Sequence, residues 1–493
     1  MTDFVLIDSP SGSEEDANFQ TLPTMAPRKK KAKIDYLEFL DAHPFVRETV
    51  VDKIYGCMVG SALGDTIGLY TESMTKSESA RRHPDRTFQL VWPATELYAD
   101  SHRTRFAPCA WTDDTDQALL IVLSYIHNYT QAGSSDPTKH ANDTLPNDFA
   151  ARLKIWFDQG LLALSRPPYG IGQLVRKVVE RREYLENPAN AAIDAWVRSR
   201  RFDAPNGSLM RTHPIGIIGT GLSEEKTWKI SVQVGWNTHV DPRCTVSCCI
   251  LVALIRGLLR GDITNEEDVD ACIERSYAWV KKNPKLMNPG GDETLSDAHI
   301  EHHLERSVFE HHVYAKTLED LKLDEGKAIG YVYKCLGSAI LLLRLVMRKG
   351  SMLSTTGGPL ALATAFEELT VDLIMEGGDA DTNGAAACAL VGAYLGYANL
   401  PSHWTLGLAH REWLMSKTYR LAVASGVIAD TLQPEDDEAA EGPRGLMREE
   451  EVELRDKALV HDMIAKVKAR QARERAEEES KKKKKCLVGW LSG

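Results

Sequence analysis

The chain has 493 residues, of which 43% are apolar and 10 are Trp, so it can hold one large domain or two ordinary ones with a sizeable core. Its formal net charge is −11, and the basic residues gather at both ends, so the middle is more acidic still, which argues against a nucleic-acid-binding body. The 9 Cys are scattered without a CxxC pair, which excludes a disulfide framework and favours a reducing compartment inside the cell.

The first 45 residues, which carry Ser, Glu, Asp and Pro, predict a disordered extension. The N-terminus lacks the basic and apolar regions of a signal peptide. Residues 27–33 form a basic cluster of the nuclear-localisation type, a pattern that is also common by chance in flexible tails. The expected location is therefore cytoplasmic, with the nucleus as an alternative. We expect no membrane-spanning helix, because the longest apolar candidate, from Ala385, is interrupted by Gly and shorter than about 18 residues.

Helical patterns begin at residue 46. Residues 51–65 predict a helix that carries Gly56, Gly60 and Gly64 on one face, where small residues allow close packing of backbones. The helix ends at Asp65, and Glu72 follows a short distance later.

An acidic cluster precedes the next apolar helix, which is expected over 118–129. Thr112, Asp113 and Asp114 stand before it, and Asp116 adds a further acid. The simplest interpretation is helix capping, because Asp and Thr are ordinary N-cap residues. Capping needs one side-chain oxygen, however, and the cluster offers at least three.

A second cluster, made of Asp379, Asp381 and Thr382, precedes an Ala-rich apolar helix. Gly377 and Gly378 allow the backbone to turn tightly before it. If the two clusters pack together, their acids repel one another and lose hydration unless cations lie between them. Oxygen ligands suit Mg²⁺ or Mn²⁺, with Ca²⁺ less favoured, rather than Zn²⁺.

Three segments between the clusters are unusual. In residues 206–216 an Asn-Gly-Ser turn can cap a helix, or its backbone N–H groups can cradle a phosphate. His239 and Asp241 stand before an apolar helix expected over 244–259, where a lone His is more often structural than functional. Residues 283–326 hold several His among charged residues without Cys, and we interpret them as a surface insertion between core helices.

Strand patterns are nearly absent, because period-two alternation never persists, so the core is predicted to be all-α. After residue 428 the sequence changes to an acidic linker and a charged tail over 429–493. Residues 481–485 are Lys, and Cys486 opens a short apolar tip, a combination that suits contact with an anionic membrane surface. A plain solvated tail is the alternative.

Taken together, these motifs resemble the ADP-ribosylglycohydrolase family, the group of the dinitrogenase-reductase activating glycohydrolase and the ADP-ribosyl-acceptor hydrolases. Five blocks carry the resemblance in order: 60–65 with Glu72, 111–115, 206–211, 238–239 and 377–383. The two acidic blocks are the specific ones, because each opens a helix. The resemblance implies a compact, mostly orthogonal all-α domain over 46–428 that binds two Mg²⁺ (or Mn²⁺), flanked by the extension at 1–45 and the tail.

The resemblance also implies roles for single residues. It places the metal ligands at Thr112, Asp113, Asp114, Asp379, Asp381 and Thr382. It places Asn206, Gly207 and Ser208 at the pyrophosphate of ADP-ribose, with Met210 in the same binding loop and His239 near the distal ribose or its phosphate. Glu72 corresponds to the family's acid near the scissile bond. Either Glu72 or Asp113 would accept the proton of the attacking water, and the sequence leaves this choice open.

The implied function is a metal-dependent hydrolase that cleaves the glycosidic bond between ADP-ribose and an acceptor, which is an ADP-ribosylated protein side chain or a related conjugate. The linkage stays open, and a monomer is expected. Residues 40–430 are expected to keep full turnover, because the extensions lie outside the domain.

Two alternatives remain. The first is a catalytically silent relative with an ADP-ribose-binding or structural role on the same fold, which the loss of a metal ligand would indicate; all six are present. The second is a two-metal phosphohydrolase on another helical fold, which usually shows His beside the acids. His213 stands where the family often has a small residue, which leaves the substrate preference open.

Overall fold

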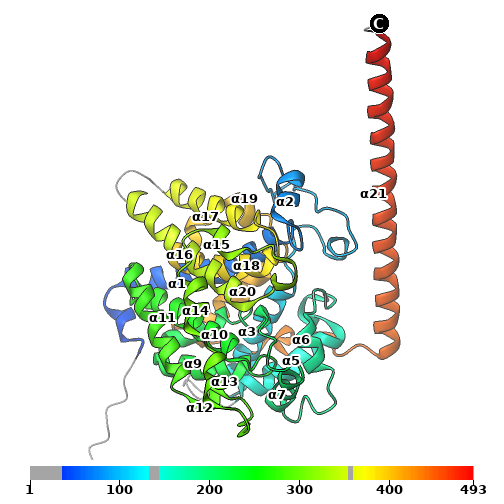
Figure 1. Ribbon diagram of the computed structural model, residues 1–493. Coiled ribbons are helices and arrows are strands. Elements are labelled where there is room, and N and C mark those ends of the chain that lie inside the picture. The colour runs from blue at the N-terminus through cyan, green and yellow to red at the C-terminus, as the bar shows by residue number, and fades with distance from the viewer. Residues whose placement is uncertain (1–35, 133–143, 354–358, 492–493) are drawn as a thin grey trace, which may run out of the picture. The chain divides into compact units, whose positions relative to one another are not determined.

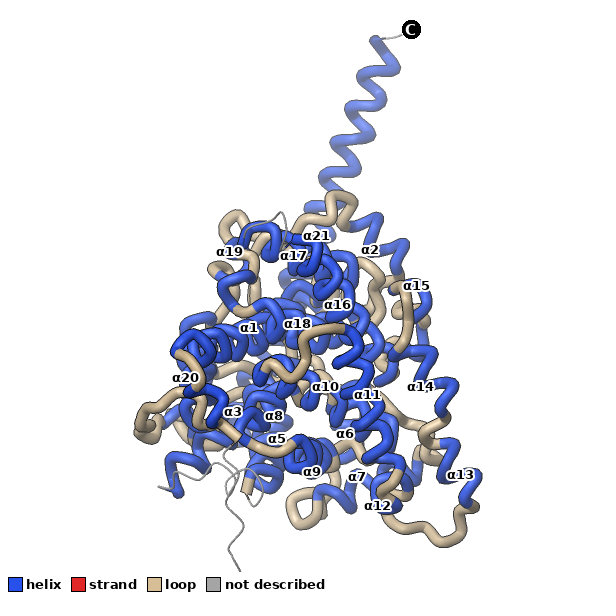
Figure 2. Tube along the Cα trace, turned by 90° about the vertical axis from the view of Figure 1, so that its left-hand side faces the viewer, coloured by secondary structure: helices blue, strands red, loops and turns tan. Residues whose placement is uncertain are grey.

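The computed structural model describes residues 36–132, 144–353 and 359–491, which fold as helices joined by loops (Figure 1). Over these ranges there is no β-strand, as Figure 2 shows, and only isolated bridges join Leu161 to Arg166 and Pro205 to Tyr331. The chain from Tyr36 onward forms one compact unit. The all-α prediction is therefore confirmed.

The N-terminal half of the chain contributes α1 (Pro44–Gly68), α2 (Lys76–Arg82), α3 (Asp113–Ala132), α5 (Leu145–Gln159), α6 (Gln173–Val179), α7 (Pro188–Arg198), α8 (His213–Ile218) and α9 (Glu224–Gly235). The C-terminal half contributes α10 (Pro242–Arg260), α11 (Glu266–Lys281), α12 (Pro284–Met287), α13 (Asp297–His302), α14 (Arg306–Val313), α15 (Leu318–Leu321), α16 (Val332–Leu353), α17 (Pro359–Ile374), α18 (Ala380–Leu395), α19 (Ser402–Thr405), α20 (Arg411–Ala424) and α21 (Glu449–Leu491). Among the short 3₁₀ helices, three matter below: η2 (Arg103–Arg105), η4 (Asn206–Ser208) and η8 (Asp436–Glu438).

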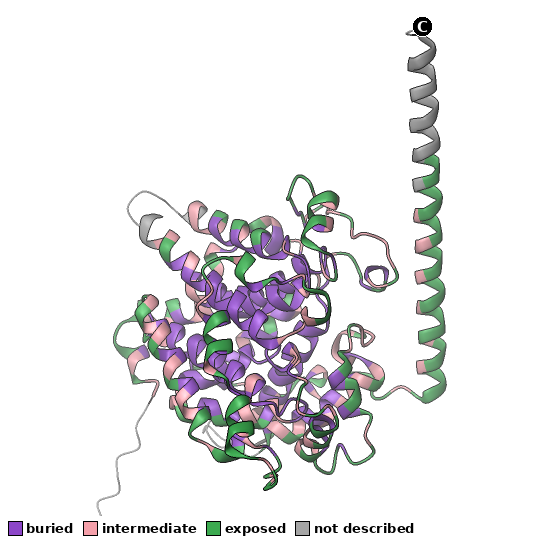
Figure 3. Ribbon diagram, in the orientation of Figure 1, coloured by how far each residue is buried: buried purple, intermediate pink, exposed green. Residues whose placement is uncertain are grey.

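Helices α1 and α18 pack against each other in the buried centre of the protein (Figure 3). A Cβ atom at Gly60 would lie 2.6 Å from the carbonyl oxygen of Cys388, and one at Gly64 would lie 2.1 Å from that of Gly384. Side chains do not fit at such distances, so the helices approach this closely only because both positions are Gly. The predicted small-residue face is confirmed, and it brings the last turn of α1 beside the first turn of α18.

Helix α10 is long and apolar enough to cross a membrane by length and composition, so the expectation that no apolar run reaches this length is wrong. However, 94% of that window is buried inside the protein. The helix begins at Pro242, and the backbone N–H of Arg243 donates to Asp241 Oδ1 at 2.8 Å, which caps it. Because it packs on α8, α9 and α11, α10 is a core helix.

The His-rich segment 283–326 is more ordered than its sequence indicates. It contains the short helices α12 to α15, and α14 packs on α16. Phe309 and Val313 are buried at this contact. The end of the segment also reaches the second acidic cluster, because a Cβ at Gly378 would lie 2.1 Å from the carbonyl oxygen of Leu323.

The C-terminal tail becomes helical in its second part, where α21 covers Glu449–Leu491; residues 429–448 are mostly loop. The basic cluster at 27–33 and the side chains of residues 481–486 lie outside the described part of the structure. The predicted nuclear-localisation and membrane-binding segments therefore stay predictions.

Candidate functional site

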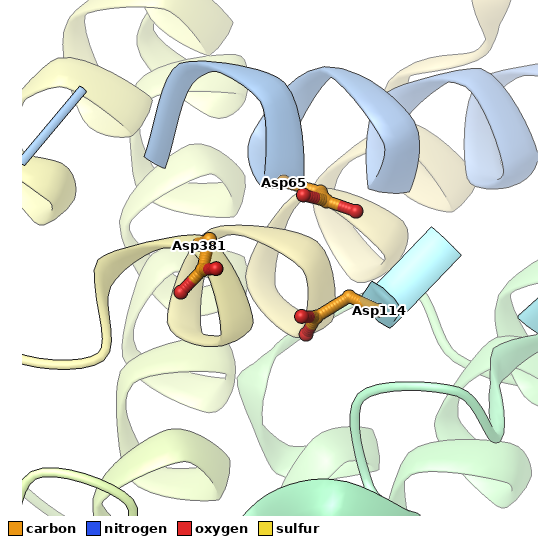
Figure 4. A group of neighbouring side chains, drawn as sticks. All are labelled: Asp65, Asp114 and Asp381. Atoms are coloured by element: carbon orange, nitrogen blue, oxygen red, sulfur yellow. The ribbon is translucent and has the colours of Figure 1, made fainter. Parts of the chain in front are cut away.

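Three buried carboxylates from three different helices meet where α1 and α18 pack together. Asp65 lies in the last turn of α1, Asp114 in the first turn of α3, and Asp381 in the first turn of α18 (Figure 4). One oxygen from each lies within 4.8 Å of the others, a spacing that allows all three to hold one metal ion. The two acidic clusters that the sequence places far apart are therefore brought together.

Asp65 joins this group to the start of α3. Its Oδ1 accepts a hydrogen bond from the backbone N–H of Thr112 at 2.8 Å. Its Oδ2 accepts from the backbone N–H of Thr115 at 3.0 Å and from the Thr115 hydroxyl at 2.6 Å. The carboxylate of Asp65 thus caps α3 from a neighbouring helix and fixes Asp114 in place.

The electrostatics of the group favour a bound cation. Burial raises the pKa of Asp65 to about 6. Burial, and then the neighbouring carboxylates, raise the pKa values of Asp114 and Asp381 well above their usual range. Asp114 Oδ1 is buried without a hydrogen-bond partner among the described residues. An unpartnered buried carboxylate oxygen beside other acids is costly unless a positive charge compensates it.

Asp113 points to a different neighbourhood. Its Oδ2 accepts from Gln117 Nε2 at 2.9 Å, and Gln117 Oε1 accepts from Arg211 at 2.7 Å. The Arg211 guanidinium is buried, so Gln117 links a buried cation to the acidic group. Gly170 lies against Asp113, since a Cβ there would lie 2.0 Å from Asp113 Oδ1.

Asp379 connects the acids to the Asn-Gly-Ser turn. Asn206, the first residue of η4, donates from Nδ2 to Asp379 Oδ2 at 2.9 Å. Its backbone N–H donates to Gly330 O at 3.0 Å, which fixes the turn to the start of the next core segment. The turn is therefore in direct contact with the second acidic cluster.

His239 lies under this turn. A Cβ at Gly207 would lie 3.1 Å from His239 Nε2, so the ring supports the turn from inside. His239 Nδ1 is 2.6 Å from the Thr238 hydroxyl, which also accepts from Arg211 at 2.5 Å. Burial, and then the charge of Arg211, lower the pKa of His239 well below its usual value, so the ring is neutral at physiological pH.

Glu72 faces the acidic group from the segment after α1. Burial raises the pKa values of Asp113, Asp379 and Asp381, and the charge of Glu72 adds to this shift. Glu72 Oε2 lies 2.5 Å from His102 Nε2, and both side chains are partly exposed. Glu72 thus has a partly exposed carboxylate next to the buried acids, and its role stays a prediction.

The sequence profile of one family, described as ADP-ribosylglycohydrolase, matches residues 46–436. The chain belongs to the ADP-ribosylglycohydrolase family. Membership supports a hydrolase at the level of the family, and the resemblance inferred from the five sequence blocks is confirmed.

Individual relatives of the ADP-ribosylglycohydrolase family are distant. An ADP-ribosylarginine hydrolase of Serratia proteamaculans is 23% identical over 73% of this chain and 76% of its own length. The ADP-ribosyl-[dinitrogen reductase] glycohydrolase of Rhodospirillum rubrum is 22% identical over 72% of this chain and 90% of its own. A solved structure, called an ADP-ribosylglycohydrolase-related protein complex, is 21% identical, with a TM-score of 0.45 over 77% of this chain and 99% of that one.

The structure brings most of the predicted ADP-ribosylglycohydrolase residues to one place. Asp114 and Asp381 belong to the compact acidic group, and the Thr112 hydroxyl donates to Asp114 Oδ2 at 3.0 Å. Thr382 is also buried, whereas Asp113 and Asp379 have hydrogen-bonding partners of their own in Gln117 and Asn206. Among the residues predicted for ADP-ribose, Ser208 and Met210 are buried in the loop that Asn206 opens. Their roles stay predictions.

Sequence reasoning missed Asp65 as a candidate ligand. Its signal was present, because an acid that follows Gly64 at the end of an apolar helix is out of place unless it has a partner. Asp116, by contrast, faces away from the site. It accepts hydrogen bonds from the indoles of Trp111 at 2.8 Å and Trp156 at 3.2 Å, so it serves the core.

Proposed function

We propose that the protein is a hydrolase, dependent on a divalent cation, that cleaves the glycosidic bond between ADP-ribose and an acceptor group. The observation that carries the proposal is the group of buried carboxylates of Asp65, Asp114 and Asp381. The family match over 46–436 supports ADP-ribosyl conjugates as the substrate class. A silent relative with no need for a metal would gain nothing from keeping three acids buried together.

The donor set fits Mg²⁺ or Mn²⁺, because it consists of carboxylate and hydroxyl oxygens. The unpartnered Asp114 Oδ1 is the atom that most needs such a charge. We propose that Asp65 joins the predicted ligands Thr112, Asp113, Asp114, Asp379, Asp381 and Thr382 in holding two ions. Such ions would bind ribose hydroxyls and lower the pKa of a water molecule.

The side chains of the protein would stabilise the developing charge and accept the proton of the attacking water. A site lined with carboxylates stabilises the positive charge that develops on the ribose ring as the glycosidic bond breaks. Glu72 or Asp113 would take the proton from the attacking water. Asp113 is fixed by Gln117, whereas Glu72 is partly exposed to an incoming acceptor.

Recognition of ADP-ribose would fall to the turn of Asn206, Gly207 and Ser208, with Met210 behind it. His239 contributes through Gly207, which it supports, because its ring is buried beneath the turn. ADP-ribosyl-arginine is the first linkage to test, since one relative is named for its hydrolysis. An action on ADP-ribosylated protein, as a monomer inside the cell, stays a prediction.

The decisive experiment is a hydrolysis panel. Purified full-length protein is given ADP-ribosyl-arginine, ADP-ribosyl-serine and O-acetyl-ADP-ribose, each with Mg²⁺, with Mn²⁺, and with EDTA followed by excess Mg²⁺. We expect release of ADP-ribose from at least one substrate, its loss in EDTA and its return with Mg²⁺. Binding of ADP-ribose without hydrolysis of any substrate would support the silent relative, and turnover unchanged in EDTA would contradict the metal centre.

A further inference from the structure

The segment between α2 and α3, residues 83–112, carries His102, the hydrogen-bonding partner of Glu72. Over this described segment the helical structure is the single turn η2. A long segment with so little regular structure needs contacts from other elements to hold a side chain in one position. Two sets of such contacts are present, one with the main chain around Glu72 and one with α21.

The inner contacts tie the segment to the main chain around Glu72. Arg103 is buried and donates from Nε to Leu69 O at 2.8 Å and from a terminal nitrogen to Glu72 O. Asp100 Oδ1 accepts from the backbone N–H groups of His102 at 2.9 Å and Arg103 at 2.7 Å. Arg103 therefore fixes the backbone of Glu72, while the His102 ring holds its carboxylate.

The outer contacts come from α21. The Arg470 guanidinium lies 3.7 Å from the centre of the Tyr98 ring, and that of Arg82 lies 3.5 Å from it. Two groups this close to one ring centre must occupy opposite faces, so the ring is enclosed between two cations. Arg470 also donates to Ala99 O and to the Tyr98 hydroxyl. Arg473 pairs with Glu96 at 3.2 Å.

The same helix is anchored at its start. Arg455 donates to Gln159 O at the end of α5 at 2.5 Å, and the Gln159 side chain exchanges hydrogen bonds with the backbone of Met447. Thus α21 joins α5 to residues 96–99. This helix begins at Glu449, beyond residue 436, where the family match ends.

We propose that His102 is a positioning residue for Glu72, and that α21 holds the segment that carries it. The inference rests on the proposed function, because it assigns Glu72 a role at the scissile bond. On this proposal α21, which lies outside the family match, affects the turnover number indirectly, through the segment that carries His102. The expectation that residues 40–430 keep full turnover is replaced by the opposite one, since such a chain lacks Arg470.

The first test addresses His102. We expect His102→Ala to lower kcat about tenfold or more, because a small displacement of a reacting group has a large kinetic effect. KM should stay within about twofold, because the proposal assigns His102 a role through Glu72 and no contact with ADP-ribose. His102→Gln retains an N–H donor and should recover most of the loss. In a Glu72→Gln background, His102→Ala should have no further effect if it acts through Glu72.

The second test addresses α21. Arg470→Ala is compared with Lys468→Ala, which removes one exposed charge from the same helix. We expect Arg470→Ala to lower kcat about threefold and to speed amide hydrogen exchange across residues 96–106, while the Lys468 variant matches wild type in both. Equal behaviour of the two variants, or higher turnover in Arg470→Ala, would overturn the role given to α21.

Hydrogen exchange separates this inference from the proposed function. If the wild-type protein hydrolyses none of the substrates, the proposed function fails. Exchange across 71–73 and 96–106 is then measured in the His102 and Arg470 variants. Faster exchange in His102→Ala and Arg470→Ala, but not in His102→Gln or Lys468→Ala, would retain the positioning network. Unchanged exchange in the two Ala variants would overturn it.

Discussion

The carboxylates of Asp114 and Asp116 lie on the same helix, two residues apart, and have opposite surroundings. Asp114 Oδ1 is buried without a partner among the described residues, whereas Asp116 accepts from two indoles. Arg166 Nε also lies 3.6 Å from Asp116 Oδ1. The environment of each acid, rather than its residue type, determines which one belongs to the site.

Substitution by Asn should therefore affect the two positions differently. Asp114→Asn removes one repelling charge and should raise the melting temperature measured in EDTA. Asp116→Asn leaves a single acceptor oxygen for two indole donors, so it should lower the free energy of unfolding by about 1–2 kcal/mol. The stabilisation by Mg²⁺ should fall in the first variant and persist in the second. Identical melting behaviour of both would refute this distinction.

The raised pKa values also give the metal-free protein a pH dependence. The folded pKa of Asp65 is about 6, above an unfolded value of about 3.9, so its contribution to stability is fully present below about pH 4 and lost as pH rises through 6. The raised pKa values of Asp114 and Asp381 act in the same direction. In EDTA the contribution of these acids to the melting temperature should fall as pH rises from about 4 through 6, and less steeply in Asp381→Asn. Equal slopes in the two proteins would contradict the electrostatic account.

At this scale the sequence predicts the acidic residues better than their partners. Two acid clusters, each before an apolar helix, were enough to predict a cation site, because capping does not need so many oxygens. The sequence did not indicate Asp65 as a candidate ligand, because its hydrogen-bonding partners, Thr112 and Thr115, are distant in the sequence. No local pattern distinguishes Asp114 from Asp116, because only the fold brings Trp156 to one of them.

At the scale of helices, the close contact of α1 with α18 sets the distance between Asp65 and Asp381. Gly64→Ala would place a Cβ 2.1 Å from Gly384 O, so the helices must separate. We expect a loss of about 1–3 kcal/mol in unfolding free energy and a weaker stabilisation by Mg²⁺. Thermal melts with and without Mg²⁺ measure both effects.

The matched control is Gly235→Ala at the end of α9, where an added Cβ meets nothing within 4 Å. This change should stabilise the protein by about 0.4–1 kcal/mol, because Ala restricts the unfolded chain more than Gly. If Gly64→Ala stabilised the protein as well, the close contact would not be what joins the two acids.

The glycine face of α1 could be predicted from the sequence, whereas its partner could not. Gly56, Gly60 and Gly64 recur at helical spacing, which is a local signal. Their partners, Gly384 and Cys388, lie more than 300 residues away along the chain. In the same way, the sequence of the His-rich segment did not predict the buried face of α14, because its apolar residues Phe309 and Val313 stand among many charged and polar ones.

At the scale of the whole molecule, a cluster of ion pairs joins residues on the two sides of the predicted domain boundary at residue 428. Lys417 is buried and lies 2.5 Å from Glu435, 2.7 Å from Asp437 and 3.2 Å from Glu438. Arg420 also pairs with Glu438, which is buried. These contacts tie η8 to α20, and residue 436 is also where the family match ends.

A chain that ends at residue 430 should therefore be less stable than one that ends at 448. Removing residues 431–448 leaves the Lys417 ammonium buried without its carboxylates, a loss of about 3–5 kcal/mol. Urea unfolding of residues 36–430, 36–448 and the full chain measures the difference. Equal stability of the two shortened chains would place the boundary at 428, as the sequence predicted.

The central claim is that Asp381 holds a catalytic cation rather than capping a helix. Its Oδ1 accepts from the backbone N–H of Thr382 at 2.9 Å, a bond that an Asn oxygen can keep. The most direct measurement pairs turnover of the best ADP-ribosylated substrate with the Mg²⁺-induced melting shift, in wild type, Asp381→Asn and the exposed control Asp85→Asn. We predict that Asp381→Asn loses at least about 100-fold in turnover, or roughly 2.7 kcal/mol, and most of the melting shift, while the control retains both. Wild-type turnover and an unchanged melting shift in Asp381→Asn would contradict the account.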